Sequence, residues 1–101
     1  MFAQTRVKYN AGLSQDIQTY IANGSYTIPA GKILLGIKVE PVADTDPFRV
    51  GTAAGLGDLV PDMPIAAATG EWIQLNINAK VATTIYFSDI TSSTQITFYK
   101  I

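Results

Sequence analysis

The side chains that most often carry out catalysis are missing from this chain of 101 residues, which contains no histidine and no cysteine. Catalytic triads built on histidine or cysteine are therefore excluded, together with disulfides and thiolate zinc sites. A glycosidase-type pair of carboxylates needs neither residue type. The aspartates available for such a pair are Asp44, Asp46, Asp58 and Asp62. All four lie in segments rich in Gly, Pro and Thr, where aspartate commonly caps turns, so we expect no enzymatic activity.

Two short segments share part of a ligand-binding pattern without completing it. Asp44-Thr45-Asp46 has the spacing of two oxygen ligands in a calcium loop, but Pro47 and Phe48 follow it, where an EF-hand continues with a third ligand and a glycine. The glycine-rich stretch 51–57 lacks the Lys-Ser/Thr of a phosphate-binding loop. We expect a surface turn and a tight loop at these places, with no metal and no cofactor.

The most informative polar side chains surround the single tryptophan. Trp72 alternates with apolar residues and shares one strand face with Asn76 and Asn78. An aromatic face beside amide groups suits contact with a sugar ring, whereas tryptophan is also enriched at subunit interfaces. Both interpretations stay open from the sequence. The candidate subunit-interface or glycan-contact residues are Trp72, Asn76, Asn78, Tyr86 and Tyr99.

The elements that must position these residues are strands, because apolar residues recur with a period of two. The alternating rows are Ile33, Leu35, Ile37 and Val39; Ile73, Leu75 and Ile77; Val81, Thr83, Ile85 and Phe87; and Ile96 with Phe98. Successive side chains of a strand point to opposite faces, so each row predicts the inward face of a packed sheet. The fold class predicted is all-β, as a single antiparallel β-sandwich.

Turn residues divide the chain between these rows and define its organisation. The predicted turns and loops are Asn23-Gly24, 29–31, 41–47, Thr69-Gly70 and 88–93. The segment 16–22 fits one helical turn or a strand equally well. We expect one domain overall, with an N-terminal arm or first strands over 1–22 and the β-sandwich over 23–101.

Charge and hydropathy exclude two classes of partner. Seven Lys and Arg residues are scattered singly and the formal net charge is −1, which does not make a surface for a phosphate backbone. No apolar run approaches the roughly 20 residues that span a bilayer, so no membrane contact is expected. Charged residues make up 15% of the chain, against about 25% in an ordinary soluble domain. The shortfall favours a surface that other subunits partly cover.

Two stretches in order carry a resemblance to a known group of proteins. Ile28-Pro29-Ala30-Gly31-Lys32 leads into the strand that ends at Val39, and the following loop contains the stretch 48–55 and then an aspartate. Together with the strand at Tyr86-Phe87-Ser88 and the Ser/Thr-rich turn after it, this order resembles small β-sandwich modules of tailed-bacteriophage virion proteins. Head fibres, capsid-decoration proteins and tail fibres contain such modules. Ala53 and Leu56 depart from the pattern of the glycine-rich loop in those modules.

The resemblance implies a jelly-roll-like sandwich and a homotrimer or larger homo-oligomer that docks on the major capsid protein or another virion protein. It also implies a place on the virion. A chain start without the charged and apolar regions of a secretory signal agrees with assembly in the host cytoplasm. The leading hypothesis is therefore a non-enzymatic virion structural protein. The alternative is a carbohydrate- or receptor-binding β-sandwich module, and weak glycan binding is compatible with both.

Overall fold

The computed structural model describes residues 13–101, and the regular secondary structure in this range consists of strands only. Their bounds are β1 Ser14–Tyr20, β2 Gly24–Ile28, β3 Lys32–Pro41, β4 Thr45–Gly51, β5 Val60–Ile65, β6 Glu71–Ala79, β7 Thr83–Ser88 and β8 Thr94–Lys100. The described residues contain no helix that is long and apolar enough to cross a membrane. The prediction of an all-β fold is confirmed. The part of the predicted N-terminal segment that lies in residues 1–12 falls outside the described residues, whereas Ser14–Tyr20 is a strand of the sandwich.

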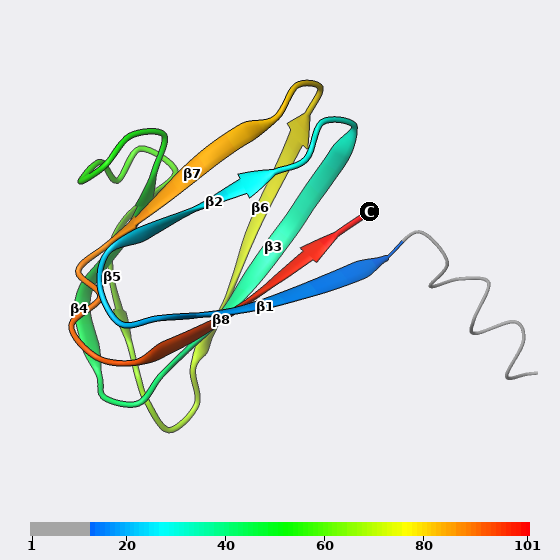
Figure 1. Ribbon diagram of the computed structural model, residues 1–101. Helices are drawn as coiled ribbons and strands as arrows, with labels where there is room; N and C mark the ends of the chain where they lie inside the picture. The colour runs from blue at the N-terminus through cyan, green and yellow to red at the C-terminus, as the bar shows by residue number, and fades with distance from the viewer. Residues whose placement is uncertain (1–12) are drawn as a thin grey trace, which may run out of the picture.

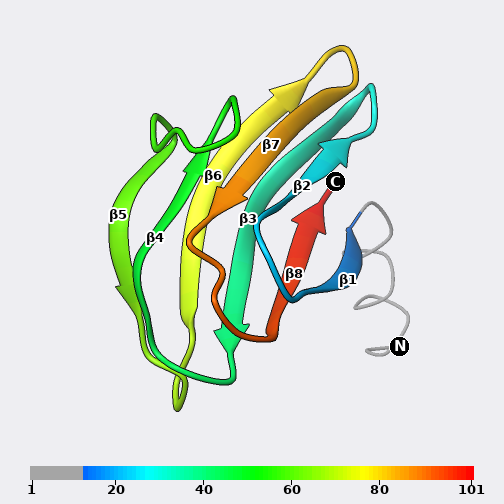
Figure 2. The ribbon, with the colours of Figure 1, turned by 60° about the vertical axis from the view of Figure 1, so that its left-hand side comes forward.

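Two four-stranded antiparallel sheets face each other (Figure 1). One sheet has the order β1-β8-β3-β6 and the other has the order β2-β7-β4-β5. Every connection except the one between β4 and β5 passes from one sheet to the other. This order is that of an eight-stranded jelly roll. In Figure 2 the β2–β3 and β6–β7 turns lie at one end of the sandwich, and the β3–β4 and β5–β6 turns lie at the other.

The core lies between the inner faces of the two sheets, where large apolar side chains are removed from water. Those that are almost completely buried are Ile28, Leu34, Ile37, Val39, Phe48, Val50, Ile65, Ile85, Phe87, Ile96 and Phe98. Aromatic contacts connect the sheets, because Tyr26 of β2 stacks on Phe98 of β8 with ring centroids 3.7 Å apart. Phe87 of β7 also contacts Phe98, at 5.7 Å. Burying each such ring stabilises the fold by roughly 1.5–3 kcal/mol.

A β-bulge in β3 changes which residues of this strand enter the core. The register against β8 and β6 shifts between Leu34 and Gly36, so that Leu35 is an extra residue relative to β8. Leu34 is therefore buried together with Ile37 and Val39, whereas Ile33 and Leu35 are only partly buried. The predicted inward row was right for its second half and wrong for its first, because the bulge shifts the alternation by one residue.

Three further differences from the sequence prediction have local causes. Strand β5 was not predicted, because Pro61 and Pro64 argue against a strand; β5 is an edge strand, where proline is tolerated. The predicted loop 41–47 is shorter, since β4 already begins at Thr45. Val81 was assigned to an inward row, but it lies exposed in the turn between β6 and β7.

A polar network crosses between the two sheets beside the stacked rings. Tyr26 of β2 donates a hydrogen bond from its hydroxyl to Asp16 Oδ2 of β1 at 2.8 Å. Lys100 of β8 is only 8% exposed, and its Nζ donates to the same hydroxyl at 2.7 Å. The Lys100 ammonium also lies 3.6 Å from Asp16 Oδ2. Because a buried ammonium without an acceptor is costly, the Tyr26 hydroxyl is what makes the burial of Lys100 tolerable.

The network also sets the ionisation of its members. The hydrogen bond from Tyr26 lowers the pKa of the Asp16 carboxyl, although partial burial opposes this effect. Burial, followed by the hydrogen bond to Asp16, raises the pKa of the Tyr26 hydroxyl well above its ordinary value. The neighbouring hydroxyl of Tyr20 has its pKa raised to about 12, mainly by burial. These tyrosines are therefore neutral donors at physiological pH.

Replacing Tyr26 with phenylalanine tests this network. Tyr26→Phe keeps the stacked ring but leaves the buried Lys100 without its acceptor, so we expect the free energy of unfolding to fall by about 1–3 kcal/mol. Urea denaturation followed by circular dichroism measures the loss. The matched control is Tyr86→Phe, whose hydroxyl makes no hydrogen bond to the groups that the structure describes and whose change is expected within about 0.5 kcal/mol. An equal loss of unfolding free energy in the two variants would contradict this role of the Tyr26 hydroxyl.

A second prediction concerns acid. Because the pKa of Asp16 is lower in the folded state, its carboxylate adds stability above the pKa of the unfolded chain, near about 4, and loses it as pH falls through the folded pKa. The stability difference between the wild type and Asp16→Asn should therefore be largest near neutral pH and shrink below about pH 4. Urea titrations at a series of pH values measure it. A difference that stays constant down to about pH 2.5 would show that the carboxylate charge has no such role.

Candidate functional site

The outer face of the β1-β8-β3-β6 sheet carries most of the predicted site residues. Antiparallel pairing places Trp72 beside Lys38, Lys38 beside Thr97, and Thr97 beside Ile17, in one row across the four strands. The next row contains Gln74, Gly36, Tyr99 and Gln15. On β3, β6 and β8 the alternating neighbours face the core, so these two rows point away from it, and the pairing of β1 with β8 extends the rows onto β1. We call this surface, with Ile33, Asn78 and Ile101 at its end, the aromatic face.

A glycine allows the tryptophan to lie across the sheet. A Cβ atom at Gly36 would be 2.6 Å from Cη2 and Cζ2 of Trp72 and equally close to the Ile73 carbonyl oxygen. The indole therefore occupies the space above Gly36 where other residues would carry a side chain. On the far side of Gly36 it meets Tyr99 of β8, with ring centroids 5.3 Å apart at an interplanar angle of 73°. This edge-to-face contact is a favourable aromatic geometry and fixes the position of Trp72.

Apolar side chains extend the aromatic face on either side of this pair. Trp72 is 46% exposed, Ile17 is 57% exposed and Ile101 is 43% exposed. Ile101 continues the sheet, because its backbone exchanges hydrogen bonds with that of Ile33 at 2.9 and 3.0 Å. The other strongly exposed apolar residues lie singly in turns and loops: Ile21, Val42, Leu56 and Val81. Scattered apolar residues are common on protein surfaces, but a group on one sheet face is typical of a contact surface.

The two predicted asparagines lie on the same strand but at a distance from the aromatic pair. Asn76 and Asn78 are both exposed, with Gln74 between them and Trp72. Asn76 has a φ of 56°, the left-handed conformation that asparagine tolerates, where β6 passes the bulge of β3. The amide nearest to the indole along β6 is thus Gln74. Ile17, Gly36 and Ile101 were missed, although a glycine inside a strand is a known sign of close approach.

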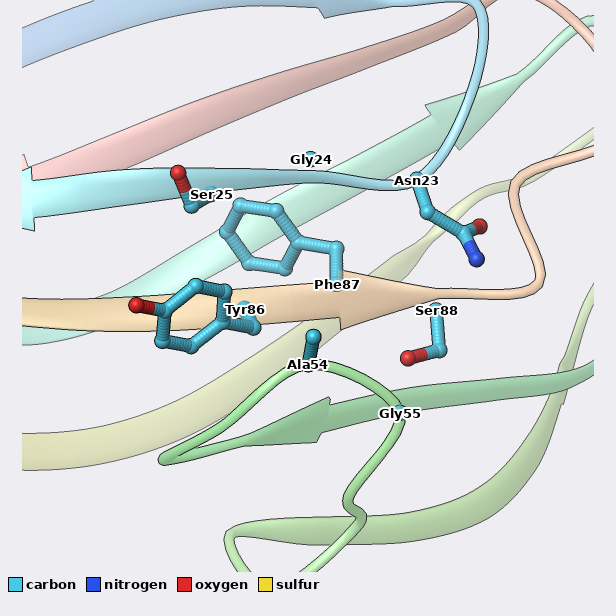
Figure 3. A pocket seen from close by; sticks show the side chains of 8 residues that line it. All are labelled: Asn23, Gly24, Ser25, Ala54, Gly55, Tyr86, Phe87 and Ser88. Carbon is cyan, nitrogen blue, oxygen red and sulfur yellow. The ribbon is translucent and has the colours of Figure 1, made fainter.

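Tyr86 does not belong to the aromatic face, because it lies on β7 in the opposite sheet. Its side chain lines a pocket of about 270 Å³ on the outer side of that sheet. Figure 3 shows that the pocket is formed by the start of β2, the end of β7 and the tip of the β4–β5 loop. The lining residues are Asn23, Gly24, Ser25, Ala54, Gly55, Tyr86, Phe87 and Ser88. The structure therefore divides the predicted site between two surfaces that face opposite directions.

Three of the aspartates considered as catalytic carboxylates contact groups in loops and on strands. Asp58 accepts hydrogen bonds from the Thr52 hydroxyl at 2.7 Å and the Thr52 amide at 2.9 Å, and these bonds lower its pKa. Asp44 accepts a hydrogen bond from the Ala67 amide at 2.8 Å. Asp62 lies 3.3 Å from the Nε of Arg49, as an ion pair without a hydrogen bond. Among the side chains that the structure describes, no three acidic, histidine or cysteine groups converge to hold a metal ion.

The contact between Trp72 and Tyr99 gives a prediction with a matched control. Tyr99→Leu removes the edge-to-face partner, so the emission of Trp72 should shift to longer wavelength as the indole meets water. The free energy of unfolding should fall by about 0.5–1.5 kcal/mol beyond the loss from buried area. Tyr86→Leu makes the same change on the other sheet and should leave Trp72 emission unaltered. Fluorescence spectra of both variants provide the measurement, and an equal shift in both would refute the described packing.

Comparison with known proteins does not assign the chain to a family. No protein-family model matches the chain, and no curated protein matches its sequence. The two surfaces described above and the residues that form them are therefore the basis for a function.

Proposed function

We propose that this protein is a non-enzymatic structural subunit of a bacteriophage particle, of the capsid-decoration or head-fibre type. It assembles into a homotrimer or larger homo-oligomer and docks on the major capsid protein or another virion protein. The observation that carries this proposal is the group of exposed apolar residues on the aromatic face. The other side of the same sheet packs in the core, so this group can only be covered by another molecule. The jelly-roll strand order supports the proposal, because that fold is frequent in viral capsid domains.

The composition of the aromatic face suits contact between copies of the chain. It contains Trp72 and Tyr99 in contact, with Ile17 diagonal to Tyr99 on β1. Aromatic residues are enriched at the centre of protein interfaces, and Lys38 is the one charged side chain in the two rows. Gln15 and Gln74 flank the centre, and their amides can donate and accept hydrogen bonds at the rim. Covering the half-exposed apolar side chains in an oligomer would stabilise it at roughly 25 cal/mol per Å² of apolar surface buried.

A sugar- or receptor-binding module is the second candidate, and one observation favours it. The Trp72 indole is held over Gly36 by Tyr99, while nearly half of the residue stays accessible. A fixed, accessible indole beside the amide of Gln74 is suited to stacking on a sugar ring. In this case a soluble glycan should change Trp72 emission in a saturable way. A flat response across a broad glycan panel would remove this candidate.

The assembly proposal predicts a defined mass and a specific way to disrupt it. Light scattering behind size exclusion should give a trimer or larger ring whose mass is the same at two well-separated protein concentrations. Ile17→Lys places a charge in the aromatic face and should shift the protein toward monomer, because an unpaired charge at an interface costs several kcal/mol. The folded monomer should be little affected, since Ile17 is exposed.

The matched control is Val81→Lys, which makes the same substitution at an exposed position in the β6–β7 turn, away from the aromatic face. It should keep the mass of the wild type. A wild-type monomer at both concentrations would reject self-assembly through this surface. An equal loss of mass in both lysine variants would reject the aromatic face as the interface while leaving open that the protein oligomerises elsewhere.

A further inference from the structure

We infer that the pocket lined by Tyr86 and Ser88 on the outer side of the β2-β7-β4-β5 sheet binds a neutral, hydroxyl-bearing ring of the size of one monosaccharide. This site is separate from the aromatic face, since the outer sides of the two sheets face opposite directions (Figure 1). An assembly formed through the aromatic face would leave the pocket accessible. The inference therefore does not depend on the proposed assembly.

A buried hydroxyl without a partner is the first observation that points to a ligand. Ser88 is only 3% exposed, and its Oγ has no hydrogen-bond partner among the described residues. Figure 3 shows this hydroxyl pointing from the end of β7 toward the loop that carries Ala54. Leaving a buried hydroxyl unsatisfied costs about 1–3 kcal/mol. This oxygen is shielded from water in the free protein, so a ligand hydroxyl that displaces its cover could bond to Ser88 and remove this cost.

The side-chain amide of Asn23, which also lines the pocket, is held in place by a hydrogen bond. Its Oδ1 accepts a hydrogen bond from the Ile90 amide at 2.9 Å. This bond fixes which end of the side-chain amide is the oxygen and leaves the two hydrogens on its nitrogen to be donated elsewhere. A fixed donor in the lining loses little entropy when a ligand binds.

The loop that closes the pocket is also built rigidly. Asp58 accepts hydrogen bonds from both the amide and the hydroxyl of Thr52, which tie the two ends of the loop together. The Leu56 amide bonds to the Ala53 carbonyl at 3.1 Å within the loop tip. Gly55 has a φ of 82°, a conformation that few other residues adopt, and this brings the tip back over β7. The pocket is therefore preformed, as ligand sites usually are.

The chemistry of the lining selects the class of ligand. None of the eight lining residues carries a charge, so an ionic ligand would lose water without gaining a counter-charge. The ring of Tyr86 offers an apolar surface, and serine and asparagine residues add hydroxyl and amide groups to the lining. An apolar ring beside hydroxyl and amide groups matches a sugar, which has both C–H faces and hydroxyls. A volume of about 270 Å³ lies just below the range for drug-sized ligands and suits a single ring.

The test is a titration of the isotope-labelled protein with neutral monosaccharides and their methyl glycosides, followed by backbone amide NMR. The monosaccharides are glucose, galactose, mannose, fucose and N-acetylglucosamine. We expect saturable shifts at Asn23, Ser25, Tyr86 and Ser88 for at least one sugar, with a dissociation constant on the order of 1 mM. Glycerol serves as an open-chain polyol and glucuronate as an anionic ring, and both should bind at least tenfold more weakly.

Two variants and one control locate the site. Ala54→Leu fills the pocket from an exposed loop position and should abolish the saturable shifts, whereas Ala53→Leu, one residue earlier and outside the lining, should not. Ser88→Ala should weaken binding roughly 3- to 10-fold, the loss of one hydrogen bond. Because the hydroxyl has no partner in the free protein, this variant should keep or raise the midpoint of urea unfolding. A purely structural role for Ser88 would lower the midpoint.

Several results would overturn the inference. No saturable shift with any sugar would exclude a monosaccharide site, even if the assembly through the aromatic face is confirmed. Shifts centred on Trp72 and Gln74 would move sugar binding to the aromatic face. Equal binding of glycerol, or tighter binding of glucuronate, would exclude a neutral ring as the ligand. Binding that survives Ala54→Leu would exclude this pocket.

Discussion

The bulge in β3 is the constraint on which the arrangement of both sides of its sheet depends. Without it, strict alternation would place Ile33 and Leu35 in the core and leave Leu34 outside. The extra residue at Leu35 instead buries Leu34 with Ile37 and turns Gly36 outward. Gly36 then lies between β6 and β8, where Trp72 from one and Tyr99 from the other can meet above it. One inserted residue thus supplies a well-packed core and a fixed aromatic pair on the surface.

Closure of the sandwich depends on contacts between sheets, since each sheet alone would leave an apolar face in water. The stack of Tyr26 on Phe98 provides apolar contact across the gap. Next to it, Tyr26 also takes part in the polar network with Asp16 and Lys100, so one residue serves both purposes. The network connects β1, β2 and β8, and two of these, β1 and β2, are edge strands of their sheets. Closing the sandwich in this way leaves two outer sides with different chemistry.

The outer sides of the two sheets suit different kinds of binding partner. The aromatic face is broad and open, with an aromatic pair and one charged side chain in its two rows, which favours another protein surface. The pocket on the other sheet is small, uncharged and closed by a loop that Asp58 holds, which favours a small polar ring. Asp58 and Asp44 accept hydrogen bonds from loop residues, and Asp62 forms an ion pair with Arg49.

The sequence by itself determined the fold class, most of the strands and the turns between them, because period-two patterning and turn residues act locally. It also placed Trp72 on an outward face, since the alternation along β6 holds from Trp72 to Leu75. It could not place the bulge, because the extra residue is defined only by its neighbours β8 and β6, which are distant in sequence. The sequence did not predict β5, because prolines are tolerated in a strand mainly when that strand lies at an edge, and only the order of strands in the sheet decides which strands are edges. Only the tertiary structure separated Tyr86 from Trp72 and Tyr99, because alternation gives the face of a strand but not the sheet to which the strand belongs.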